Sequence, residues 1–181
     1  MIRDNKKKII NIFILYIIVL CMTGCGKEKV PKPVEGKYVS MDGSSYIVLS
    51  DYTDERPKNS EDVFGKCKLQ FTNVDLSGFS EFCILNAASN YISVNKLTEL
   101  TKEEVDRIKN KFESNIDLKK QFMDNKAEFQ YFYSEEEKGY GFMCEIEGSG
   151  FDGAYECYVA AEYVADEKAI ICDEVKYILE D

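Results

Sequence analysis

The last third of the chain alternates regularly between apolar and polar positions, and this pattern constrains the fold more than any other feature of the sequence. Successive side chains of a β-strand point to opposite faces, so a period of two predicts strands with one buried face. Turn-forming residues at 135–139, 148–153 and 166–168 separate the alternating segments. The apolar positions are Phe129, Tyr131, Tyr133, Tyr140, Phe142, Cys144, Ile146, Tyr155, Cys157, Val159, Ala161 and Tyr163, and a last strand follows at 169–179. Four consecutive strands joined by short turns predict an antiparallel meander.

Further strands are expected nearer the N-terminus. Segments 36–41 and 45–51 flank Asp42-Gly43, which favours a tight hairpin because glycine accepts a positive φ. Residues 66–71 alternate again, with Cys67, Leu69 and Phe71 on the apolar side. A total of about 7–9 strands predicts a mostly β (α+β) fold in which the meander curls or closes into a barrel, because open edges would be exposed. An open sheet covered on one face by a helix is the alternative.

One helical segment is predicted near 101–125. Thr101 and Glu104 have the spacing of a capping box, in which each side chain satisfies a backbone donor of the first turn. An apolar stripe at helical spacing follows, consisting of Val105, Ile108, Phe112 and Ile116. We expect an interruption of this helix near 114–115. The segment at 80–97 is ambiguous, because its short apolar run fits a buried strand as well as a helical turn.

The N-terminus has the composition of a secretory signal. Basic residues at positions 3 and 6–8 precede an uncharged apolar run from 9 to 22, which is too short for the ~20 residues of a membrane-spanning helix. The run ends in Met22-Thr23-Gly24-Cys25, which resembles the lipobox of bacterial lipoproteins. This resemblance covers residues 1–25 only. It implies that Cys25 becomes the new N-terminus and carries a diacylglycerol with palmitate-like acyl chains.

The resulting organisation is a lipoprotein signal peptide at 1–24, a lipidated tether at 25–35 and one extracytoplasmic β-rich domain at 36–181. Two prolines favour an extended tether, which would place the domain roughly 30 Å from its lipid. The expected location is the outer face of a bacterial cell membrane. Heavy use of Ile, Lys and Asn is typical of AT-rich genomes and favours a Gram-positive host.

The charge of the chain restricts its partners. The net charge is −10 for the whole chain and becomes −13 once residues 1–24, with four basic residues and one acidic residue, are removed. Phosphate backbones repel so acidic a domain, which makes nucleic acid a poor partner. Anionic lipid heads would repel it too, so the lipid on Cys25 is the expected hold on the membrane.

Seven cysteines allow two interpretations. With Cys21 in the signal and Cys25 lipidated, five remain, and their spacing matches no zinc framework. They are either mostly buried thiols or include one disulfide, for which Cys144 and Cys157 on successive predicted strands are the best pair.

The chain has no histidine, so it holds neither a Ser-His-Asp nor a Cys-His arrangement. Ser93 and Lys96 match a Ser-x-x-Lys spacing, but chance alone yields about one such match, and the accompanying motifs are missing. The acidic segment 51–55 lacks the spacing of a calcium loop and is interpreted as solvated. The sequence predicts no catalytic, metal-binding or cofactor-binding residues, and thus a protein that is not an enzyme; the alternative that stays open is an enzyme with an unusual site that uses no histidine.

Aromatic residues are the remaining signal for a site. They would line the interior of a closed barrel, where they either fill the core or form a pocket for a small amphipathic ligand. The candidate pocket residues are Tyr131, Tyr133, Tyr140, Phe142, Tyr155, Tyr163 and Asp173. Asp173 interrupts the inward alternation of Ile171, Val175 and Tyr177, which indicates either a bulge or strand edge, or a polar group inside the pocket. The expected function is non-enzymatic binding of such a ligand or of an envelope partner; the alternative is a structural or assembly accessory that acts through its surface.

Overall fold

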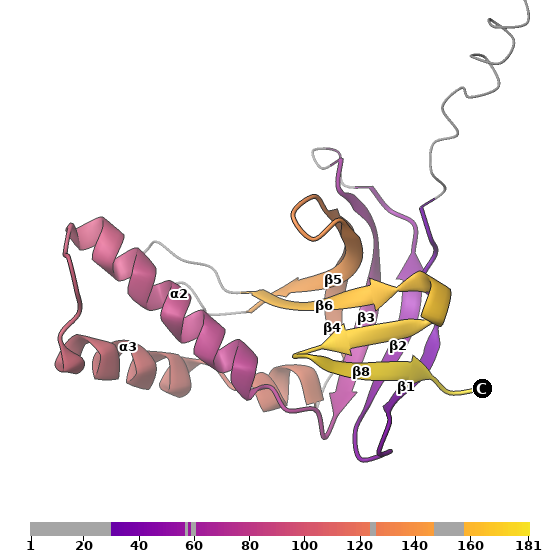
Figure 1. Ribbon diagram of the computed structural model, residues 1–181, viewed down its shortest axis with the longest axis horizontal. Coiled ribbons are helices and arrows are strands. Elements are labelled where there is room, and N and C mark those ends of the chain that lie inside the picture. The colour runs from indigo at the N-terminus through magenta and orange to yellow at the C-terminus, as the bar shows by residue number, and fades with distance from the viewer. Residues whose placement is uncertain (1–29, 57, 59–60, 124–125, 147–157) are drawn as a thin grey trace, which may run out of the picture. The chain divides into compact units, whose positions relative to one another are not determined.

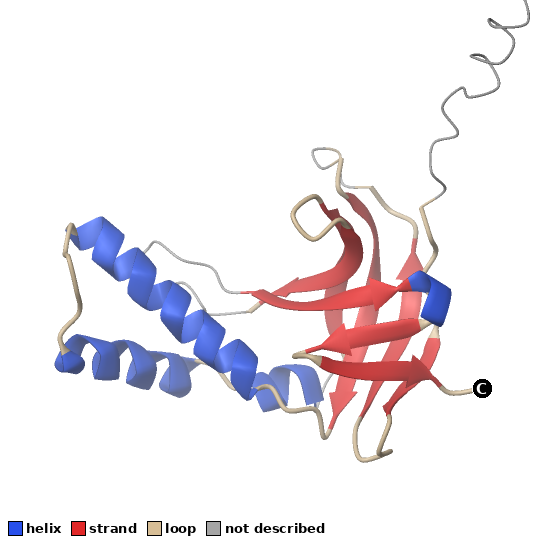
Figure 2. Ribbon diagram, in the orientation of Figure 1, coloured by secondary structure: helices blue, strands red, loops and turns tan. Residues whose placement is uncertain are grey.

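Eight antiparallel strands of the described residues close into a barrel in which each strand pairs with its neighbours in the chain and β8 pairs with β1 (Figures 1 and 2). The computed structural model describes residues 30–181 apart from 57, 59–60, 124–125 and 147–157. The chain divides into two units, Met1–Lys32 and Pro33–Asp181, and all of the strands and helices described here belong to the second. The strands are β1 (Gly36–Ser40), β2 (Tyr46–Thr53), β3 (Val63–Thr72), β4 (Ala127–Ser134), β5 (Gly139–Glu145), β6 (Tyr158–Val164), β7 (Ala169–Cys172) and β8 (Val175–Leu179). The predicted meander and its closure into a barrel are confirmed, and the open sheet covered by a helix is not formed.

The core occupies the inside of the barrel because one face of each strand is apolar. On β3, Cys67, Leu69 and Phe71 are buried, whereas Lys68 between them is exposed. The same face continues across the cross-strand pairs of the barrel wall, for example from Leu69 to Leu49 on β2. Burial of this apolar surface is the main driving force for closing the sheet.

The last predicted strand is two strands joined by a turn of two residues. Cys172 pairs with Val175, and Asp173 and Glu174 between them have φ values of 49° and 64°. Positive φ at both central residues is typical of the type I′ turn, which matches the twist of a hairpin. Asp173 is therefore neither a strand bulge nor a polar group inside the barrel. The inward position predicted for Ile171 is also wrong, because the buried positions of β7 are Ala169, Ile170 and Cys172.

A helical segment is inserted between β3 and β4. It consists of α2 (Ser77–Asn95), α3 (Lys102–Asn115) and a one-turn π-helix, η1 (Lys119–Met123). The ambiguous segment at 80–97 is thus helical. The predicted capping box is present, with the Thr101 hydroxyl accepting the Glu104 N–H at 3.3 Å and Glu104 Oε2 accepting the Thr101 N–H at 2.8 Å. The interruption expected near 114–115 occurs where α3 ends at Asn115.

Connections between antiparallel strands alternate between the two ends of the barrel. At one end, which we call the entry end, lie the start of β1, the loop after Thr53, the β4–β5 turn and a 3₁₀ turn, η2 (Ala165–Glu167). At the other, the helical end, lie the β1–β2 turn, the inserted helices and the β7–β8 turn. Helices α2 and α3 pack against each other, and their barrel-proximal ends are the N-terminus of α2 and the C-terminus of α3 (Figure 1).

Candidate functional site

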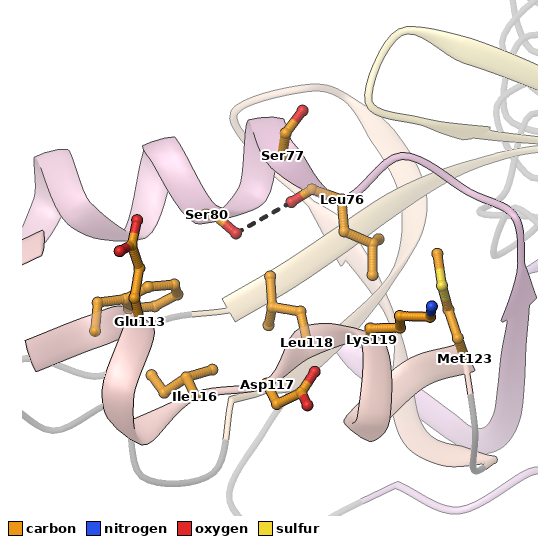
Figure 3. Close-up of a pocket in the computed structure, with 10 residues that line it drawn as sticks. Leu76, Ser77, Ser80, Glu113, Ile116, Asp117, Leu118, Lys119 and Met123 are labelled. Atoms are coloured by element: carbon orange, nitrogen blue, oxygen red, sulfur yellow. Dashed lines mark hydrogen bonds between the residues drawn. The ribbon is translucent and has the colours of Figure 1, made fainter. Parts of the chain in front are cut away.

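A hollow of about 440 Å³ lies where the helical insertion meets the barrel (Figure 3). Its volume falls in the range of small-molecule sites, which is roughly 300–1,000 Å³. The start of α2, the last turn of α3 and η1 form its walls. The lining combines five apolar and five polar side chains: Leu76, Phe112, Ile116, Leu118 and Met123, with Ser77, Ser80, Glu113, Asp117 and Lys119.

The start of α2 is held in place by local contacts. The Asp75 carboxylate accepts the Ser77 N–H at 2.9 Å, and Leu76 is buried. Gly78 lies against the β7–β8 turn so closely that a Cβ at this position would be 2.3 Å from Asp173 Oδ1. A larger residue here would have to displace the Asp173 side chain, so glycine lets the first turn of α2 lie close against this turn. The Asp173 side chain thus lies beside the start of the helix that borders the hollow.

The opposite wall is built where α3 ends and η1 begins. Phe112 and Ile116 continue the apolar stripe of α3 into the hollow and are buried, as is Leu118. Asp117 Oδ1 accepts the Lys120 N–H at 3.0 Å, so its carboxylate caps the turn that leads into η1. On β3, the side-chain amide of Gln70 donates to the Met123 carbonyl at 3.4 Å and links η1 to the barrel.

Phe122 of η1 fills the helical end of the barrel. Its side chain is fully buried, and its ring centroid lies 5.9 Å from that of Phe71 and 5.8 Å from that of Phe129. Phe71 and Phe129 are themselves 5.9 Å apart, so the three rings form one cluster. The hollow consequently lies outside a closed apolar plug and not inside the barrel.

Most of the predicted pocket residues do come together, but they pack against one another. The Tyr131 ring centroid lies 5.8 Å from that of Tyr140, 5.4 Å from that of Phe142 and 6.0 Å from that of Tyr163, and the Tyr133 and Tyr140 rings are 5.1 Å apart. Burial raises the pKa of the Tyr131 hydroxyl. This dense packing favours the core interpretation.

Asp173 does not belong to this aromatic group, because the β7–β8 turn lies at the helical end. Tyr155 falls outside the described residues. Half-buried Tyr52 and Phe64, which the sequence interpretation did not include, contact Tyr131 from the entry end.

At the entry end, two buried tyrosines bind the segment that precedes β1. The Val34 N–H donates to Tyr163 Oη at 3.2 Å, and the Tyr38 hydroxyl donates to the Val34 carbonyl. Pro33 is buried, and the Glu35 carboxylate accepts the Tyr52 N–H at 2.6 Å. Residues 33–35, which were assigned to the tether, are thus attached to the barrel.

Three of the described cysteines have thiols with little nucleophilic character. Burial raises the pKa of Cys67 and Cys172 to about 12 and that of Cys144 to about 11. Such thiols stay protonated at neutral pH, and the thiolate is the reactive form. The Cys144 thiol donates to the Glu145 carbonyl at 3.3 Å. Because Cys157 lies outside the described residues, its pairing with Cys144 stays a prediction, as does lipidation of Cys25, which also lies outside them.

The described residues contain neither a metal-binding cluster nor a membrane-spanning helix. No three His, Cys, Asp or Glu side chains in this part of the chain lie close enough together to hold a metal ion. In the same part, no helix has the length and apolarity needed to cross a membrane.

Sequence reasoning did not find the hollow, because its walls come from three helical pieces that no repeat or motif connects. The one available signal was the interruption after 115, where the buried Ile116 and Leu118 bracket the polar Asp117. Comparison with models of known protein families, with curated proteins and with solved structures found no match to this chain.

Proposed function

We propose that this protein is a lipid-anchored, non-enzymatic binding module of a bacterial cell envelope, and that its ligand is a small amphipathic molecule bound in the hollow. The observation that carries this proposal is the mixed lining of the hollow, with buried apolar side chains beside carboxylates, hydroxyls and an ammonium group. Small-molecule sites combine a largely apolar wall with a few polar groups that fix orientation. The aromatic interior of the barrel supports the proposal less, because its rings contact one another.

Filling the hollow is expected to abolish ligand binding. Ser80 lines the hollow from α2, and its hydroxyl donates to the carbonyl of Leu76, the residue just before this helix. In a Ser80→Phe variant, the ring would occupy space that a ligand needs, so a small molecule that co-purifies with the wild type should disappear from the native mass spectrum. The full-length chain, extracted from cells in detergent, is the sample for this measurement.

Ser89→Phe is the matched control, since Ser89 is an exposed residue of the same helix outside the hollow. This variant should keep the co-purified molecule. Equal retention of the molecule by both variants would place the site elsewhere and contradict the proposal.

Lipid attachment is expected to depend entirely on Cys25. In a Cys25→Ala variant, the thioether bond cannot form, so metabolic labelling with a fatty acid should fall to background and an unprocessed precursor should accumulate. The control is Cys21→Ser, four positions before Cys25, and this variant should keep its fatty-acid labelling. Labelling and maturation of Cys25→Ala would disprove the anchoring part of the proposal.

One observation favours the accessory function as a second candidate. Helix α2 carries a single charged residue, Glu81, and exposes Phe82, Leu85 and Val94 at 54%, 68% and 60%. Exposed apolar residues of this size are typical of protein contacts when they are contiguous. A variant with Phe82→Ser and Leu85→Ser should bind the small molecule as the wild type does. If these substitutions alone abolish the cellular role of the protein, the accessory function is the correct one.

A further inference from the structure

Opposite charges border the hollow on opposite sides. Figure 3 shows Glu113 and Lys119 separated by its apolar centre, where Leu76 and Leu118 lie. Glu113 belongs to the last turn of α3, and Lys119 is the first residue of η1. The break between these two helices therefore holds a carboxylate and an ammonium group apart, on the rim of one hollow.

The Glu113 side is arranged for a cation. Glu113 supplies the carboxylate at this edge, whereas the other lining carboxylate, Asp117, lies apart from it below Leu118 and accepts the Lys120 N–H (Figure 3). Helix α3 has no basic residue in its last turn, so the negative end of its dipole is not neutralised there. Lys109 lies 3.8 Å from Glu113, but both side chains are more than half exposed, and such a pair contributes little.

The Lys119 side is arranged for an anion. Among the described residues that line the hollow, Lys119 is the one with a positive charge. The N-terminus of α2 also borders the hollow and has no side-chain cap, but the Asp173 carboxylate already lies against its first turn at Gly78. An incoming carboxylate would therefore be bound by Lys119 and not by this helix end.

We infer that the hollow takes a zwitterionic ligand with an apolar body, of which a short apolar peptide with free termini is the simplest chemical form. Its ammonium group would face Glu113, its carboxylate Lys119, and its side chains the apolar residues between them, Leu76 and Leu118. This inference rests on the proposed function and names the ligand class of the same site. Charge complementarity of this kind selects a ligand more than it strengthens binding, because the charges are exposed to water.

Four probes with the same apolar body test the inference: Leu-Leu, N-acetyl-Leu-Leu, Leu-Leu-amide and N-acetyl-Leu-Leu-amide. Binding to the full-length chain in detergent is measured by isothermal titration calorimetry. Leu-Leu should bind most tightly, and blocking either terminus should raise Kd by roughly twofold to fivefold, as expected for exposed ion pairs. Glu113→Gln should remove the preference for the free amine, and Lys119→Met the preference for the free carboxylate. Glu99→Gln, in the exposed loop between α2 and α3, should change neither.

The outcomes separate this inference from the proposed function. Tighter binding of the fully blocked probe than of Leu-Leu, or no binding of any of the four, overturns the zwitterion inference. A preference for Leu-Leu that persists in both charge variants overturns it as well. The proposed function fails on a different result, namely when Ser80→Phe keeps the molecule that co-purifies with the wild type.

Discussion

Replacement of Phe122 by alanine is expected to lower the free energy of unfolding by about 3–5 kcal/mol, the usual cost of removing a buried phenylalanine ring. Phe122 is fully buried and contacts both Phe71 and Phe129, so its loss leaves a cavity at the helical end of the barrel. The two rings on the strands cannot move inward to fill that cavity, because the barrel fixes their backbones. Since domains are stable by roughly 5–15 kcal/mol, this single change removes a large part of the total.

Urea unfolding followed by circular dichroism measures this loss, and Phe82→Ala is the matched control. Phe82 has the same side chain but is 54% exposed on α2, so its replacement should cost less than about 1 kcal/mol. A Phe122→Ala variant as stable as Phe82→Ala would show that η1 does not close the barrel in solution. The Phe122→Ala variant should also lose ligand binding, because Lys119 and Met123 line the hollow and belong to the same helical turn as Phe122.

Gly65→Ala is expected to disrupt the pairing of β2 with β3. A Cβ at this position would lie 2.4 Å from the Thr53 carbonyl oxygen and 2.9 Å from the Tyr52 ring. The carbonyl belongs to the backbone of the neighbouring strand, so no side-chain rotation relieves the clash. We expect a loss of about 1–3 kcal/mol, as is usual for overpacking, and a change in the near-ultraviolet circular dichroism of the Tyr52 and Tyr131 ring pair.

Gly139→Ala provides the comparison, because the nearest atom to a Cβ at that position is the Glu137 carbonyl oxygen at 3.8 Å. With ordinary contact and no strained φ, this change should be neutral or slightly stabilising through the unfolded state. Equal stability of the two variants would contradict the close approach of β2 to Gly65.

The strands were predictable because a strand with one buried face alternates between apolar and polar residues in the sequence. Aromatic side chains recur at every second position along β4 (129, 131 and 133) and along its partner β5 (140 and 142). The structure buries three of them, Phe129, Tyr131 and Phe142. Asp173 and Glu174 were not recognised as a turn, because the usual mark of a type I′ turn is Asn-Gly or Asp-Gly. Here two acidic residues adopt positive φ, and the strand was therefore read as continuous.

Helix α2 shows why periodicity did not decide its structure. Its apolar residues are distributed around the helix, so that Cys83 and Ala87 are buried while Phe82 and Leu85 are exposed. Neither a helical stripe nor a strand alternation emerges from such a sequence. The helix forms because it packs against α3, whose own stripe at Ile108 and Phe112 was evident. The hollow depends on where these helices end, and helix ends set by tertiary contacts leave no local pattern.

The pair of tyrosines that binds Val34 determines how the barrel would bear mechanical load. If Cys25 is lipidated, tension between the membrane and a bound partner enters the barrel at Val34, through the hydroxyls of Tyr38 and Tyr163. It then runs along β1, which is hydrogen-bonded to β2 on one side and β8 on the other. The ladder bonds lie perpendicular to the strand, so they are sheared together and do not open one after another. An anchor at this position lets the hydrogen bonds of β1 to both neighbouring strands resist the pull collectively.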